Sequence, residues 1–259
     1  MEINNKRGVI MLTKTELKKY MNITGFDLWQ TEKDYLQHLF LIFLSRRSKD
    51  QLVFKGGTAL QKIYGLNRFS SDLDFTMKKK MDDEIIEKIS RDVKLFGFDC
   101  KFKKIKSYPS LVFKLMIKGP LFDGSNLSIS SLRLEINKKD EVLLEPEIKE
   151  VYPIYNDLQP YTCLVMDLRE ILAEKIRAIL TRQKARDVYD LWFLLKKNVD
   201  VDINLINKKL EFYNKRFNKK EFISQLKKME KIWSVELKPL LNFIPPFQNV
   251  FDKIVDKLK

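Results

Sequence analysis

Asp72 and Asp74 are the feature of this sequence with the clearest chemical meaning. They lie in the segment 71–77, whose odd positions from 73 onward are apolar and even positions polar, a period of two that predicts a strand. Both carboxylates then project from one face, about 7 Å apart along the chain. Two negative charges at that spacing need a cation to offset their repulsion, and carboxylate oxygens suit Mg²⁺ together with phosphate and water. The pair therefore predicts a magnesium site.

Two further segments alternate in the same way and supply more charged side chains. The segment 131–137 places Arg133 and Glu135 on its polar face, and the segment 111–117 places Lys114 there. In a single sheet, Glu135 completes a cluster of three acids able to hold two Mg²⁺ ions. Arg133 and Lys114 can reach a triphosphate or RNA, although a solvent-facing sheet position explains each of them equally well.

A glycine pair precedes the acids and suggests a phosphate-binding turn. In Lys55-Gly56-Gly57-Thr58, the glycines let the backbone approach a phosphate closely, and a short helix expected over 59–64 would present its free N–H groups. Thr58 can cap that helix or bind a phosphate oxygen. A Gly-Gly-Thr turn or an Asp-x-Asp pair alone is often only structural. Their combination indicates nucleotide binding by Lys55, Gly56, Gly57, Thr58 and, beside the first acid, Ser71.

The C-terminal part of the chain reads as helical from about residue 161 onward. Asp167, followed by Glu170, resembles a capping box that opens a helix running to about residue 184. Lys175 falls within the apolar arc of that helix and therefore needs an anion. The anion is either a nucleotide phosphate or Asp187 on the next helix, which begins near residue 185.

Three polar residues of that next helix complete the set of candidates. Asp187 lies at the edge of the apolar stripe and can orient Lys175 or the substrate. Arg186 and Asp190 are four residues apart, the spacing of a surface ion pair on a helix. Asp190 is also a candidate nucleotide-binding residue.

Composition describes the class of protein and its partners. Lysine and arginine outnumber aspartate and glutamate by 49 to 35, for a net charge of +14, which favours nucleic acid or another polyanion. Lysines scattered over a solvated surface are the alternative interpretation. The two cysteines form no CxxC pair, and the single histidine, His38, is expected on the surface of a helix over 32–47. No segment resembles a signal peptide or a membrane span, so a cytoplasmic protein is expected.

These patterns predict an α+β fold with two parts. A mixed sheet with helices is expected over 1–160, as the catalytic domain. An all-helical domain is expected over 161–259, contributing to the cleft and to acceptor binding. The sequence contains no recognisable internal repeat.

The sequence resembles a known family, the AbiEii/AbiGii-type toxins of the DNA polymerase β-like nucleotidyltransferase superfamily. The resemblance rests on the stretches 55–60 and 68–75, with support from 174–175 and 186–191. It implies transfer of a nucleoside monophosphate from a nucleoside triphosphate with Mg²⁺, in bacterial toxin–antitoxin or phage-defence (abortive infection) systems, with a possible cognate antitoxin. Some members modify the 3′ end of tRNA. Many relatives have Gly-Ser where this chain has Gly57-Thr58, and commonly an aspartate where Glu135 stands.

The favoured mechanism is attack of an acceptor hydroxyl on the α-phosphorus of the triphosphate. Asp72, Asp74 and Glu135 would hold the metal ions, and Lys175 would offset the charge of the leaving pyrophosphate. The net charge favours RNA as acceptor, and a protein hydroxyl would make the chain a protein-adenylylating enzyme. The rivals are glycosyl transfer, a non-catalytic nucleic-acid-binding module, and a toxin that acts by capturing a partner.

Overall fold

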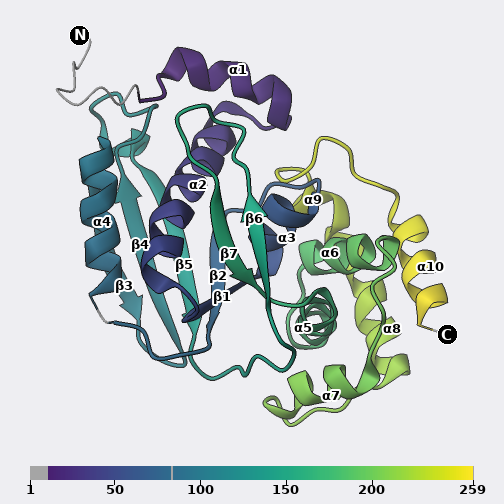
Figure 1. Ribbon diagram of the computed structural model, residues 1–259. Coiled ribbons are helices and arrows are strands. Elements are labelled where there is room, and N and C mark those ends of the chain that lie inside the picture. The colour runs from purple at the N-terminus through teal and green to yellow at the C-terminus, as the bar shows by residue number, and fades with distance from the viewer. Residues whose placement is uncertain (1–10, 83, 259) are drawn as a thin grey trace. The chain divides into compact units, whose positions relative to one another are not determined.

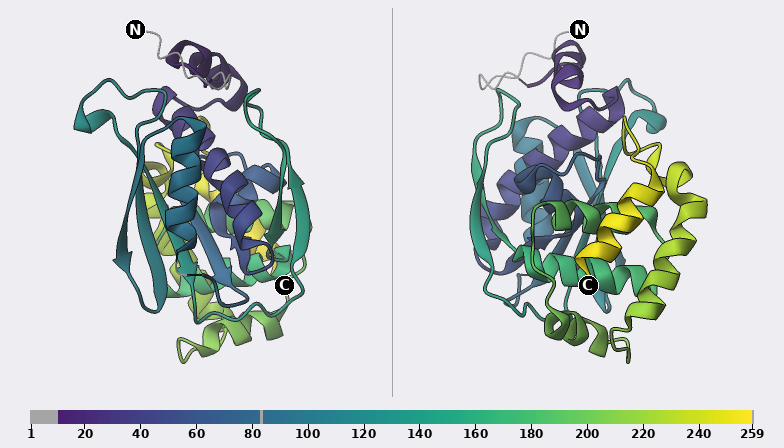
Figure 2. Two further views of the ribbon diagram at one scale, coloured as in Figure 1. Left: turned by 60° about the vertical axis from the view of Figure 1, so that its left-hand side comes forward. Right: turned by 90° about the vertical axis from the view of Figure 1, so that its right-hand side faces the viewer.

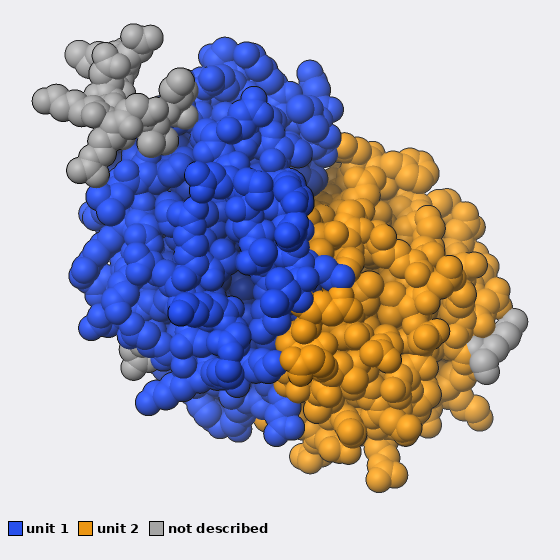
Figure 3. Space-filling model, in the orientation of Figure 1, with its two compact units in different colours: residues 1–59, 71–141, 148–165 blue, residues 60–70, 142–147, 166–259 orange. Residues whose placement is uncertain are grey.

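The computed structural model describes residues 11–82 and 84–258, which group into two compact units. The first unit contains 1–59, 71–141 and 148–165, and the second contains 60–70, 142–147 and 166–259 (Figure 3). Each unit is thus built from separate stretches of chain, whereas the sequence suggested one division near residue 160. The chain crosses between the units several times, and the motif region 55–74 contains two of these crossings.

Within the described residues, seven strands form one mixed sheet in the first unit (Figure 1). Its order is β3-β4-β5-β2-β1-β7-β6. The β2 strand runs antiparallel to β1 and parallel to β5, so it lies in the middle of the sheet. The strands are β1 (Leu52–Lys55), β2 (Asp72–Met77), β3 (Cys100–Lys106), β4 (Ser110–Ile117), β5 (Ser130–Asn137), β6 (Glu147–Val151) and β7 (Tyr161–Val165).

One face of this sheet is apolar and covered by helices. Leu73 of β2 pairs with Leu134 of β5, which pairs in turn with Phe113 of β4, and all three are buried. Helices α2 (Leu28–Ser48) and α4 (Ile85–Phe96) lie side by side over this face (Figures 1 and 2). Helix α1 (Lys14–Thr24) packs on α2. The strong alternation of β2, β4 and β5 therefore arises because one face is packed and the other carries charge.

The α+β expectation is confirmed, and the three predicted strands are present with ends within one residue of those expected. Four strands were not predicted. Three of them lack a clear alternation: β1 is fully buried, and β3 and β6 are mostly exposed edge strands. The expectation of helix from residue 161 onward is wrong for Tyr161–Val165, which form β7 because this segment pairs with β1 before the first C-terminal helix begins.

His38 is buried, so the prediction of a surface position is wrong. Its Nδ1 lies 2.9 Å from the hydroxyl of Tyr161, and its Nε2 lies 3.7 Å from the carboxylate of Asp34. Asp34 also accepts a hydrogen bond from Tyr155 at 2.8 Å. Helix α2 is buried around most of its circumference, which explains why its sequence alone does not distinguish a wet face from a packed one.

The second unit is helical. Asp167 caps α5 as expected, by accepting a hydrogen bond from the backbone of Arg169, but Glu170 does not complete a capping box. Glu170 is fully buried, accepts hydrogen bonds from the backbones of Leu143 and Leu144, and pairs with Lys209 at 2.6 Å. The helices are α5 (Leu168–Thr181), α6 (Ala185–Lys196), α7 (Ile203–Glu211), α8 (Lys219–Lys228), a 3₁₀ turn η2 (Met229–Ile232), α9 (Trp233–Leu237) and α10 (Phe247–Lys257).

Helix α3 (Gly56–Tyr64) follows β1 directly, and the chain passes from the first unit to the second within it. A short 3₁₀ turn, η1 (Asn126–Ser128), precedes β5. Among the helices in the described part of the chain, none combines the length and apolar character needed to cross a membrane.

Candidate active site

The polar face of the first unit's sheet carries the predicted acids on its central strand. Asp72 and Asp74 are both half-buried, at alternate positions of β2. Strand pairing sets Asp74 opposite Lys55 of β1 on one side and Glu135 of β5 on the other. Asp72 is paired with Arg133 of β5. The sheet therefore brings the predicted acids and their neighbouring cations onto one face, as the alternation implied.

The glycine turn and the second acid are in direct contact. Gly56 has φ +75°, and a Cβ built there would lie 2.6 Å from Oδ2 of Asp74. The positive φ alone favours glycine, and the approach of the carboxylate excludes any side chain. Gly56 thus allows the chain to turn from β1 into α3 while Asp74 lies against its backbone.

Thr58 ties the same helix to the first acid. Its side chain is fully buried, and its hydroxyl donates a short hydrogen bond to the backbone carbonyl of Asp72. Ser71 donates to the Asp72 carboxylate at 3.1 Å. The Thr58 hydroxyl therefore positions β2 against α3, and the predicted binding of a phosphate by Thr58 rests on its backbone N–H at the start of that helix.

Glu135 lies beside Asp74 but is paired with a cation. Its carboxylate is 2.9 Å from the guanidinium of Arg133, and both side chains are more than a third exposed. Across the described residues, no group of three or more aspartate, glutamate, histidine or cysteine side chains converges closely enough to hold a metal. The donors that fit Mg²⁺ are thus the two hard carboxylates of β2, since this ion takes one or two carboxylates and completes its shell with phosphate and water.

The remaining predicted residues of this face have distinct surroundings. Lys55 is buried and pairs with Asp140 at 3.4 Å, in the loop after β5. Lys114 of β4 is exposed and lies opposite Arg133 in the sheet. Lys55 is therefore held in place beside Asp74, whereas Lys114 is open to solvent.

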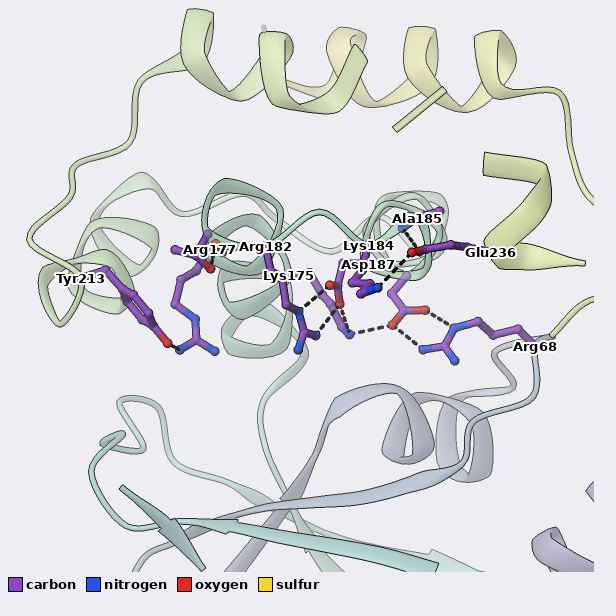
Figure 4. Close-up of polar contacts among 11 residues, drawn as sticks. Arg68, Lys175, Arg177, Arg182, Lys184, Ala185, Asp187, Tyr213 and Glu236 are labelled. Atoms are coloured by element: carbon purple, nitrogen blue, oxygen red, sulfur yellow. Dashed lines mark hydrogen bonds and ion pairs between the residues drawn. The ribbon is translucent and has the colours of Figure 1, made fainter. Parts of the chain in front are cut away.

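A second group of predicted residues forms an ion network inside the second unit (Figure 4). Lys175 of α5 lies 3.1 Å from Asp187 and 2.7 Å from Asp190, both of α6. Arg182 contacts Asp187 at 2.9 Å, and Arg68 contacts Asp190 at 2.6 Å. Lys175 is buried, as its place in the apolar arc predicted, and its anions are these two aspartates.

Both aspartates are fully buried yet remain charged. Burial raises the pKa of Asp187, but Lys175 and Arg182 outweigh it and hold the pKa well below its usual range. Burial likewise raises the pKa of Asp190, and Arg68 and Lys175 reverse the shift and lower it. The network is therefore a set of internal ion pairs that stabilise the acids in their charged form.

Most of the chain matches one protein family. The family described as "Nucleotidyl transferase AbiEii toxin, Type IV TA system" matches residues 42–257, most of the chain. The chain belongs to the AbiEii family. It is a nucleotidyltransferase toxin of a type IV toxin–antitoxin system, which implies a nucleoside triphosphate substrate and a cognate antitoxin.

Solved structures show the same fold. MenT4, described as a nucleotidyltransferase toxin from Mycobacterium tuberculosis H37Rv, has a TM-score of 0.69 at 18% identity, covering 95% of this chain and 88% of its own. JHP933 from Helicobacter pylori has a TM-score of 0.59 at 22% identity, covering 90% of this chain and 91% of its own. A search of curated proteins found no match.

Sequence reasoning missed two cations of this AbiEii-family chain. Lys33 of α2 is half-exposed; burial lowers the pKa of its ammonium, and the charges of Asp72 and Glu32 oppose that shift. Arg68 is buried and forms a paired contact with Asp190 through Nε at 2.6 Å and Nη2 at 2.7 Å. Arg68 could have been noticed from its place in the Arg68–Phe75 motif, but nothing local to Lys33 indicates its interaction with Asp72.

The predicted surface pair between Arg186 and Asp190 is wrong. Asp190 is fully buried and its partners are Arg68 and Lys175. Helical spacing identifies neighbours on the same helix, whereas Arg68, a partner of Asp190, is 122 residues away in sequence. Asp190 therefore belongs to the core of the second unit.

Proposed function

We propose that this toxin transfers a nucleoside monophosphate from a nucleoside triphosphate to a hydroxyl at the 3′ end of an RNA, with tRNA as the first candidate. The observation that supports this most strongly is the contact between Gly56 and Asp74. It places the start of a helix, which suits a phosphate, directly beside a carboxylate that suits Mg²⁺. Neither element alone indicates a reaction, but a triphosphate and its metal ion need both.

The residues of the first unit would divide the work as follows. Asp72 and Asp74 hold Mg²⁺, which when bound would offset charge on the reacting phosphate oxygens. The backbone N–H groups of Gly57 and Thr58 at the start of α3 bind the β- and γ-phosphates. Lys33, whose ammonium form is favoured by the charge of Asp72, would add a positive charge near the triphosphate.

The reaction would form one bond and break one. The acceptor oxygen bonds to the α-phosphorus, the bond between the α-phosphorus and the bridging oxygen breaks, and pyrophosphate leaves while the hydroxyl proton passes to solvent. Keeping the acceptor and the triphosphate in line is the main contribution of the protein. Glu135 would be available to hold a second ion only if its carboxylate separated from Arg133.

Lys175 and Asp187 are proposed to act as a unit in this reaction. Lys175 would supply the positive charge of this unit, and Asp187, 3.1 Å away, would fix the direction of its ammonium group. The remaining partner of Lys175, Asp190, is itself fixed by Arg68. Replacing Asp187 would then change the position of Lys175 and not only its charge.

The test is incubation of the protein with each α-labelled nucleoside triphosphate, Mg²⁺ and total RNA. Wild type is compared with Asp74→Ala, and with Asp92→Asn as a control, since Asp92 pairs with Arg47 between the two helices of the apolar face. Label in RNA that disappears with Asp74→Ala supports the proposal. Label in protein names a different acceptor, and label that persists in Asp74→Ala contradicts the proposed metal site.

A further inference from the structure

The edge strand β3 carries lysines on the same face of the sheet as the acids. Pairing sets Lys103 opposite Lys114 of β4, Lys114 opposite Arg133 of β5, and Arg133 opposite Asp72 of β2. One row thus runs across four strands from the sheet edge to the first acid. Lys101 and, beyond an irregularity in the strand, Lys106 flank Lys103 on that face. We call Lys101, Lys103, Lys106, Lys114 and Arg133 the basic track.

The track places like charges directly opposite one another, which destabilises a sheet unless something offsets the repulsion. Arg133 has Glu135, but Lys101, Lys103, Lys106 and Lys114 are exposed and form no ion pair within the part of the chain described. Exposed lysines elsewhere do find acids, as Lys88 does with Asp82. Within the described residues, the four lysines of the track therefore lack the acidic partner that other exposed lysines have.

The position of the track fits an acceptor strand. The Gly56 turn follows β1, which is on one side of β2, whereas β5, β4 and β3 extend from the other side. A triphosphate at the turn and a polyanion on the track would therefore approach Asp72 and Asp74 from opposite sides. Three strand spacings separate Lys103 from Asp72, about 14 Å, which is enough for several backbone phosphates.

We propose that the basic track binds the phosphates of a single-stranded RNA and leads its 3′ hydroxyl to Asp72. This inference rests on the proposed transfer to RNA and names the surface that holds the acceptor. Lysines on an edge strand also prevent edge-to-edge association. That role would be served equally by Lys104, which is exposed on the other face of β3 and unpaired within the described residues.

Lys104 supplies the matched control. Lys103→Gln and Lys104→Gln each remove one positive charge from adjacent exposed positions, on opposite faces of one strand. Binding of a single-stranded RNA of about 12 nucleotides, a length typical of single-strand sites, is measured without nucleoside triphosphate over a range of salt concentrations. Lys103→Gln is expected to weaken binding and reduce the slope of log affinity against log salt by about 0.7. The double variant with Lys106→Gln should reduce it by about twice as much.

The control and the nucleotide assay make the outcomes distinct. Lys104→Gln should retain the wild-type slope, and all variants should retain wild-type melting temperature and triphosphate binding. Equal slopes for Lys103→Gln and wild type, or equal losses for Lys103→Gln and Lys104→Gln, would overturn the track. If Lys103→Gln shows the slope change but wild type labels no RNA, the track stands and the proposed transfer fails. If wild type labels RNA but Lys103→Gln leaves the slope unchanged, the proposed transfer stands and the track fails.

Discussion

Two pairs of aspartates in this protein have opposite surroundings. Asp72 and Asp74 are half-buried on a strand whose polar face carries exposed cations. Asp187 and Asp190 are fully buried on α6, where Lys175, Arg68 and Arg182 lie within about 3 Å of them. The cations that pair with Asp187 and Asp190 are side chains of the protein itself. The first pair is placed where a cation can come from solution together with a ligand.

This difference separates acids that are open to a ligand from acids that internal cations hold inside the fold. A buried acid with internal cations contributes to folding, because removing either partner leaves an unpaired charge in a low-dielectric interior. A half-exposed acid beside a glycine turn contributes little to folding and can change its partners when substrate binds. The two pairs should therefore respond oppositely to the same substitution, in activity and in stability.

Asp74→Asn should have the largest effect on activity. Loss of a carboxylate that holds the metal removes several kcal/mol of charge stabilisation in the transition state. This corresponds to a loss of at least about 10³-fold in transfer rate. The melting temperature should remain near that of wild type because the side chain is half-buried on a polar face. The rate is measured by incorporation of α-labelled nucleotide. A stability loss as large as the activity loss would remove the distinction between the two pairs.

Asp190→Asn should have the largest effect on stability. It leaves Arg68 buried without its carboxylate, and breaking a buried pair costs about 3–5 kcal/mol. Urea unfolding monitored by circular dichroism measures this. Arg186→Ala is the control on the same helix, because Arg186 is half-exposed and should change stability by less than about 0.5 kcal/mol. Similar losses for the two variants would contradict the buried network.

Gly56→Ala should reduce activity more than its effect on stability predicts. Gly65 has nearly the same backbone, φ +76°, but nothing lies within 4 Å of an added Cβ, whereas at Gly56 the Asp74 carboxylate is 2.6 Å away. Both substitutions should cost about 1–2 kcal/mol of stability through the left-handed backbone. Only Gly56→Ala should displace Asp74 and reduce the transfer rate, by about 10²-fold. Equal rates in the two variants would show that the contact does not matter for transfer.

The acid pair of α6 should also produce a small pH dependence. The pKa values of Asp187 and Asp190 are lowered in the folded protein, so their contribution to stability is complete above about pH 4, the unfolded value. That contribution is lost as the pH falls through the lowered values. Asp187→Asn should make the fall in unfolding free energy below pH 4 shallower by up to about 1.4 kcal/mol per pH unit. Urea titrations at several acidic pH values measure it.

The sequence predicted the polar face well because strand alternation is a local signal. Asp72, Asp74, Glu135, Arg133 and Lys114 all lie on one face, as their spacing indicated. Their pairing across strands was not predictable, since register depends on how distant segments align. The bond between Arg133 and Glu135 is one consequence, and it changes what the third acid can do.

Tertiary contacts were invisible to the same reasoning. The Thr58 hydroxyl donates a hydrogen bond to the backbone carbonyl of Asp72, and the Asp190 carboxylate forms an ion pair with Arg68. The sequence motifs singled out both residues, but a motif does not say which atom has which partner. Lys33 was missed because its helix is buried on nearly every side, and its amphipathic pattern is weak.

Binding of Mn²⁺ in the presence of a non-hydrolysable nucleoside triphosphate tests the central contrast most directly. Electron paramagnetic resonance of wild type, Asp72→Asn and Asp187→Asn compares one member of each acid pair, with melting curves to show that each variant is folded. Loss of bound Mn²⁺ in Asp72→Asn and its retention in Asp187→Asn is the expected result. Wild-type Mn²⁺ binding by Asp72→Asn would contradict the account.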